Sequence, residues 1–259
     1  MELTAFDGLG WFLLALVPFL IVQRFLHQEL QRLLFLICRN QAVAMTVFSL
    51  FFLPGVLIHE GSHYIMAKIL HVPTGKISLI PHQLPGGKMR LGYVEIRRSD
   101  FLREAIIGAA PLLTGGIAVA CIGLFGFGLS SATVFVESGD WRAVLTSFET
   151  ITRQPDFWLF FYLAFVISSM MLPSASDRQT WFPIILFLIL LLVVVMIAGG
   201  GSWLLNHAAP PINLIMRATA AIFWVSLFIH IILLLPIYVA RLLMEQVPVL
   251  ISREKNRAH

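Results

Sequence analysis

The stretch SLFFLPGVLIHEGSHYIMAKILH, residues 49–71, decides how the rest of the chain is interpreted. It places His59, Glu60 and His63 in a His-Glu-x-x-His pattern inside an apolar run. Residues four apart lie on one face of a helix, so both imidazoles can bind one metal ion while Glu60 reaches a water at that metal. Zinc is the expected ion, because it accepts neutral imidazole nitrogens and its catalytic sites keep one position open.

The competing interpretation is a chance match on a helix that uses polar residues for packing. In a chain of this His and Glu content, so short a motif arises at random on the order of once in a hundred cases. Two histidines and a carboxylate within five residues of an apolar segment are rarer, since each is costly in lipid and tends to mark function. The pattern therefore favours a metal site.

The composition indicates a polytopic membrane protein. Of the 259 residues, 58% are hydrophobic and 12% are charged, and the mean hydropathy is +0.87. Soluble domains have about a quarter of their residues charged. Cys38 and Cys121 are far apart, in or beside apolar segments, so no disulfide framework is expected. The net charge of +4 reports loop orientation in a membrane protein, and no nucleic-acid partner is expected.

The apolar segments predict an α-helical polytopic fold with about six transmembrane helices, each needing about 17–25 residues. The predicted spans are residues 9–22 (extendable to 26), 42–70, 105–129, 157–172, 182–205 and 212–240. Residues 28–40 mix Glu29, Arg32 and Arg39 with apolar residues, which leaves an interfacial helix or an extension of a neighbouring helix open. Five or seven spans are the alternatives. The chain is taken as one membrane domain, 1–259, in which 181–259 supplies two accessory helices and a basic tail.

Residues 71–100 differ in character from the apolar spans on either side. Strand-forming residues occur near 76–80 and 89–97, and Pro81, Pro85, Gly86 and Gly87 lie between them. The segment therefore predicts a β-hairpin or small sheet at the membrane surface, between the second and third spans.

Loop charges predict the orientation of the chain. Residues 71–103 contain six basic side chains, whereas 130–156 contain two basic and four acidic ones. Further basic residues follow position 240. The positive-inside rule then places the hairpin and the C-terminus in the cytoplasm. We expect a multi-pass protein of the cell membrane.

A third metal ligand is needed, because a catalytic zinc has three protein ligands. With the predicted topology, the chain returns to the side of His59 and His63 near Asp177, just after an apolar helix interrupted by proline. The alternative role of Asp177 is to cap the fifth span. Substitute ligands are Glu104, His71 and His82.

The His-Glu-x-x-His motif, IGAAPLLTG at 107–115 and LPSASD at 172–177 together resemble the site-2 protease family of intramembrane zinc metalloproteases. The resemblance covers residues 42–180. It implies zinc bound by His59, His63 and Asp177, with Glu60 as catalytic acid and base. It also implies a substrate-positioning segment that contains Pro111 and Thr114.

The chain departs from the family pattern at four positions. Ala110 and Thr114 stand where the second motif usually has Gly and Asn, and Leu172 and Arg178 stand in place of Asn and Gly in the third motif. These departures indicate a divergent branch, and residues 71–100 are too few for the PDZ domain that some members carry.

The leading function is hydrolysis of a peptide bond in a membrane-anchored protein near the cytoplasmic face, inside the lipid bilayer. One alternative is a non-catalytic membrane scaffold or subunit that retains the protease fold. Another is a zinc hydrolase of the prenyl-protein protease type, which needs a carboxylate other than Asp177.

Overall fold

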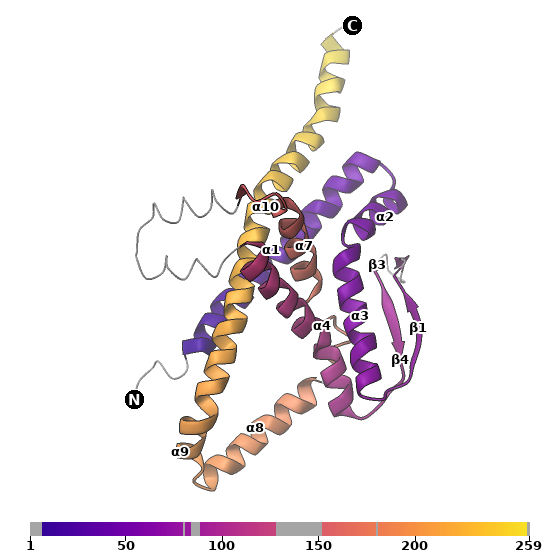
Figure 1. The fold of residues 1–259 in the computed structure, drawn as a ribbon. Helices are drawn as coiled ribbons and strands as arrows, with labels where there is room; N and C mark the ends of the chain where they lie inside the picture. Colours follow the sequence, from indigo (N-terminus) through magenta and orange to yellow (C-terminus); the bar gives the residue numbers. More distant parts are fainter. Residues whose placement is uncertain (1–6, 80, 84–88, 128–151, 180, 258–259) are drawn as a thin grey trace, which may run out of the picture.

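The computed structural model describes residues 7–79, 81–83, 89–127, 152–179 and 181–257 (Figure 1). The helices are α1 (Asp7–Cys38), α2 (Gln41–Phe51), α3 (Leu53–Ile69), α4 (Phe101–Cys121), α7 (Phe157–Met170), α8 (Trp181–Ile197), α9 (Gly201–Trp203) and α10 (Ala209–Arg257). Two π-helical turns, η2 (Ile122–Gly126) and η4 (Leu204–Ala208), continue α4 and α9. Four short strands lie between α3 and α4, namely β1 (Thr74–Ser78), β2 (His82–Gln83), β3 (Met89–Arg90) and β4 (Tyr93–Ile96).

The chain is an α-helical membrane protein. In the part of the chain that the structure describes, three helical segments are long and apolar enough to cross a bilayer: Asp7–Cys38, Phe101–Gly126 and Gly201–Gln246. The pair α2 and α3 makes a fourth if the two helices are counted as one bent span. Helices α7 and α8 are apolar but have 14 and 17 residues. These long apolar helices agree with the membrane protein that the composition predicts.

The predicted second span is two helices that meet at an angle of 67°. Helix α2 ends at Phe51 and α3 begins at Leu53, with Pro54 in its first turn. Proline has no backbone N–H to donate to the preceding turn, but it suits the start of a helix. The bend therefore follows from the sequence, and it directs α3 with the His-Glu-x-x-His motif away from α2 (Figure 1).

The charged segment 28–40 is an extension of the first helix, since α1 is continuous to Cys38. Glu29 is only 1% exposed, and its carboxylate accepts a hydrogen bond from the Arg241 guanidinium of α10. Arg32 donates to the other Glu29 oxygen over 2.9 Å. Because a charged group inside an apolar protein needs a partner, this ion pair allows α1 to carry charge where α10 packs along it (Figure 1).

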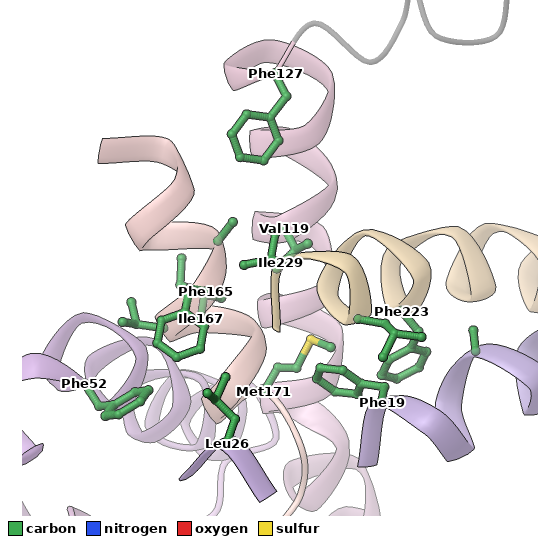
Figure 2. Packing of buried hydrophobic residues seen from close by; sticks show 14 of the residues in the cluster. Phe19, Leu26, Phe52, Val119, Phe127, Phe165, Ile167, Met171, Phe223 and Ile229 are labelled. Atoms are coloured by element: carbon green, nitrogen blue, oxygen red, sulfur yellow. The ribbon is translucent and has the colours of Figure 1, made fainter. Parts of the chain in front are cut away.

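The apolar core lies where α1, α4, α7 and α10 meet, beside the junction of α2 and α3 (Figure 2). Phe19 of α1 and Phe223 of α10 are fully buried, with ring centroids 5.5 Å apart. Small residues let α7 come close to its neighbours. A Cβ on Gly55 of α3 would lie 2.2 Å from the Val166 carbonyl oxygen, and one on Gly115 of α4 would lie 2.5 Å from Met171 Cβ. Such close helix contacts are how membrane helices gain packing energy without a solvent-driven hydrophobic effect.

The segment between α3 and α4 contains β structure, as the sequence predicts. β1 pairs antiparallel with β4, with Ile77 opposite Val94, and β2 pairs antiparallel with β3. β4 lies along α3 (Figure 1). Gly92, just before β4, packs so closely that a Cβ there would be 2.9 Å from Val56 and 3.1 Å from Glu60 Cγ. The β segment therefore borders the motif helix.

Candidate metal centre

The structure brings His59, His63 and Asp177 together. The Nε2 atoms of the two histidines are 3.3 Å apart. Asp177 Oδ2 lies 3.7 Å from His59 Nε2, and Asp177 Oδ1 lies 3.5 Å from His63 Nε2. The three side chains are 7–15% exposed. Three side chains that each offer a ligand atom therefore converge on one point from α3 and from the loop after α7.

Backbone carbonyls orient both imidazole rings. His59 Nδ1 lies 2.6 Å from the Met170 carbonyl oxygen, and His63 Nδ1 lies 2.9 Å from the Ile107 carbonyl oxygen. Because a carbonyl only accepts hydrogen bonds, each Nδ1 carries a proton and donates it. The neutral tautomer then leaves the Nε2 lone pair of each ring free for a metal, which is the usual arrangement of metal-binding histidines.

The donor set fits a zinc ion. Two lone pairs 3.3 Å apart repel each other unless a proton or a metal cation lies between them. Ligand atoms 2.0–2.1 Å from a tetrahedral zinc are separated by about 3.3–3.4 Å. The observed separations of 3.3, 3.5 and 3.7 Å are close to this value. Two imidazoles and one carboxylate also form a ligand set that zinc uses in catalytic sites.

Pro111 explains why the Ile107 carbonyl is available to His63. Ile107 and Pro111 are four residues apart in α4, where the N–H of residue 111 would normally bond to the oxygen of residue 107. Proline has no such N–H. The oxygen left without a helical donor accepts the His63 Nδ1 proton instead. Pro111 is buried and does not line the cavity around the ligands, so its link to the site runs through this carbonyl.

We expect Pro111→Ala to weaken metal binding by about tenfold, the scale of losing an outer partner of a metal-binding histidine. The alanine N–H would compete with His63 for the Ile107 oxygen. The measurement is zinc affinity by competition with a chromophoric chelator. Pro18→Ala is the matched control, because Pro18 also lies inside a helix but in α1. Equal affinities in wild type and Pro111→Ala would remove this role from Pro111.

A short loop fixes Asp177. Ser174 N donates to Asp177 Oδ2 over 2.7 Å, and Asp177 N donates to Ser174 Oγ over 3.3 Å. The Asp177 backbone also packs on Gly108 of α4, where a Cβ would lie 2.3 Å from the Asp177 carbonyl oxygen. Burial raises the pKa of the Asp177 carboxyl, but the adjacent His59 and His63 imidazoles and the hydrogen bond from Ser174 N outweigh it and bring the pKa below its usual range. The carboxylate is thus ionised and able to bind a cation.

The position of Asp177 does not suit a helix cap, because α8 begins only at Trp181 and the carboxylate bonds back to Ser174. Among the substitute ligands, Glu104 accepts a hydrogen bond from Ser99 N over 2.9 Å and is not part of the three-residue cluster. His71 is exposed in the turn after α3. The side chain of His82 lies outside the described part of the chain.

The three candidate ligands lie in a cavity of about 710 Å³. Glu60 is 9% exposed and lines the same cavity, next to His59 in sequence. The other walls come from α1, α4, the β segment and the end of α7, including Gln23, Leu91, Gly92, Val94, Arg97, Arg98, Glu104, Gly108, Ser169, Leu172 and Gln179. The volume is in the range of small-molecule binding sites, about 300–1,000 Å³. The cavity thus offers room beside Glu60 and the ligands.

Thr114 lies away from this cavity. Its side chain is exposed, and its hydroxyl donates to the Ala110 carbonyl oxygen of its own helix over 2.9 Å. From the IGAAPLLTG segment, the cavity is lined by Ile107 and Gly108 instead. Sequence reasoning did not single out Gly108, Gln23 or the Ile107 and Met170 carbonyls, which take part in the site. Only the two carbonyls had a signal in the sequence: Pro111 lies four residues after Ile107, and an apolar helix ends at Met170.

No protein-family model, no curated protein and no solved structure matches the chain.

Proposed function

We propose that this protein is an intramembrane zinc metalloprotease of the site-2 protease type. The observation that carries the proposal is the convergence of two Nε2 atoms and a carboxylate at zinc-like spacings, with both imidazole tautomers set by backbone carbonyls. The proposal is also supported by Glu60, which lines the same cavity as the candidate ligands.

His59, His63 and Asp177 would hold the zinc. When bound, a zinc ion acts as a Lewis acid that polarises a substrate carbonyl and makes water more acidic. Glu60 is the buried carboxylate of the motif, and it is not one of the three candidate ligands. We assign it to accept the proton of the attacking water as the new C–O bond forms, and to donate that proton to the amine nitrogen as the C–N bond breaks.

The substrate in this proposal is a membrane-anchored protein cleaved near the cytoplasmic face. Apolar helices surround the site, and the basic residues of the β segment and of the C-terminal tail favour the cytoplasmic side for both by the positive-inside rule. The three long helical segments, the bent pair α2–α3 and the shorter helices α7 and α8 together make six spans. An even number of spans places the N-terminus on the cytoplasmic side as well. We propose the cell membrane as the location.

A non-catalytic scaffold is the second candidate function. It is favoured by Leu172, which lines the cavity where the family pattern has an asparagine that can contact a substrate. An apolar side chain at this place offers no hydrogen bond. The two functions differ in one respect that is easy to measure, namely whether a peptide bond is broken.

We expect purified, reconstituted protein to release a fluorescent domain from at least one of a pool of single-span reporter proteins. Treatment with 1,10-phenanthroline is expected to stop release, and added zinc is expected to restore it. Release that continues after full metal removal would contradict the zinc mechanism. Zinc-loaded protein that cleaves no reporter of the pool would favour the scaffold.

A further inference from the structure

The C-terminal end of α7 connects the candidate metal centre to two distant helices. The last carbonyls of a helix have no partner within it. At the end of α7, the Met170 oxygen accepts the His59 Nδ1 proton over 2.6 Å, and the Ser169 oxygen accepts a hydrogen bond from Gln23 Nε2 of α1 over 2.6 Å. The neighbouring carbonyls of Met170 and Ser169 therefore accept hydrogen bonds from side chains of α3 and α1, respectively.

The hydroxyl of Ser169 makes a third connection, to α10. Ser169 Oγ lies 2.9 Å from His230 Nε2, and both side chains are buried. His230 Nδ1 lies 2.7 Å from the Ser226 carbonyl oxygen, so it carries the ring proton and donates it. Nε2 then accepts the Ser169 hydroxyl proton. The His230 ring is held in place between Phe19 and Phe165, at centroid distances of 5.1 and 5.0 Å.

The neighbouring serine shows that this bridge is not needed to satisfy a buried hydroxyl. Ser168 is fully buried, and its hydroxyl donates to the Ala164 carbonyl oxygen of its own helix over 2.6 Å. A helical serine commonly satisfies itself in this way. Ser169 instead bonds across to another helix, at the residue directly before the carbonyl that orients His59.

We propose that Gln23, Ser169 and His230 act as positioning residues for the metal ligand His59. They fix the last turn of α7 from α1 and α10, so that the Met170 carbonyl meets His59 Nδ1 and aims Nε2 at the metal. This inference rests on the proposed metal centre. It gives α10, which otherwise packs as an accessory helix, a part in setting the metal affinity.

The test compares Ser169→Ala with Ser168→Ala in the full-length protein, with cobalt(II) as the probe. Both variants remove one buried hydroxyl from adjacent positions of α7. We expect Ser169→Ala to displace the Met170 carbonyl from His59 Nδ1 and so to raise the cobalt dissociation constant by about tenfold, the scale of losing an outer partner of a metal ligand, and to shift the visible absorption bands of bound cobalt. Ser168→Ala is expected to stay within about twofold of wild type, and Ser169→Thr, which keeps a hydroxyl, is expected to recover part of the loss.

The same measurements on Gln23→Met, which keeps the side-chain length and loses the amide, give an independent result if Ser169→Ala does not fold. Equal affinities and spectra for Ser169→Ala, Gln23→Met and Ser168→Ala would overturn the positioning role. Wild-type protein that binds neither cobalt nor zinc would instead overturn the metal centre itself, and the inference with it. The two failures are therefore distinguishable.

Discussion

Replacing Glu60 by glutamine is expected to abolish peptide hydrolysis while the protein keeps its zinc. Glutamine has nearly the same size and shape, but its neutral amide does not accept the proton of the attacking water. General acid–base catalysis contributes about 10²–10⁴-fold to rates, so cleavage of the reporter should fall by at least that factor. Zinc content should be unchanged, because the cluster of ligand atoms consists of His59, His63 and Asp177.

The control for this variant is Glu104→Gln. Glu104 is a second carboxylate that lines the same cavity, and it hydrogen-bonds to Ser99 N at the start of α4. We expect this variant to retain most of its activity. Undiminished cleavage by Glu60→Gln would show that another group transfers the proton, and would contradict the mechanism proposed here.

Replacing Asp177 by alanine is expected to lower zinc affinity by more than about 100-fold, since losing a ligand exceeds the 10–100-fold cost of losing an outer partner. The change also removes the negative charge next to two imidazoles that lie 3.5 and 3.7 Å from its oxygens. Zinc affinity by chelator competition is the measurement. Ser176→Ala is the control, because Ser176 is exposed in the same loop and lines the same cavity. Equal zinc affinity in Asp177→Ala and Ser176→Ala would move the third ligand elsewhere.

The part of the site that follows helical periodicity could be predicted from the sequence. His59 and His63 are four residues apart on one helix, so their proximity depends only on local geometry. Asp177 lies 114 residues after His63, and its selection depended on a topological argument. The structure places it beside both histidines.

The partners that orient the ligands could not be predicted in the same way. The Ile107 and Met170 carbonyls are backbone groups, and every residue has one, so no residue type marks them. What marks them is the absence of a helical donor, at Pro111 in one case and at the end of α7 in the other. This absence becomes informative only when it is known which side chain lies nearby.

The long first helix shows a second limit of sequence reasoning. Glu29, Arg32 and Arg39 left open whether residues 28–40 form an interfacial helix or extend a neighbouring helix, because hydropathy treats each charge as unpaired. The compensating residue, Arg241, is 212 positions away on α10. Hydropathy alone also does not settle the span count, because α7 and α8 are apolar but have only 14 and 17 residues, below and at the lower end of the length of an ordinary span.

The measurement that tests the metal centre most directly is zinc per chain in detergent-purified protein, wild type beside His63→Ala and Asp177→Ala. We expect about one zinc per wild-type chain and little in either variant. Zinc lost in His63→Ala but kept in Asp177→Ala would leave a metal site with a different third ligand. Wild-type protein that holds no zinc even after the metal is added would contradict the central claim that these three side chains form a zinc site.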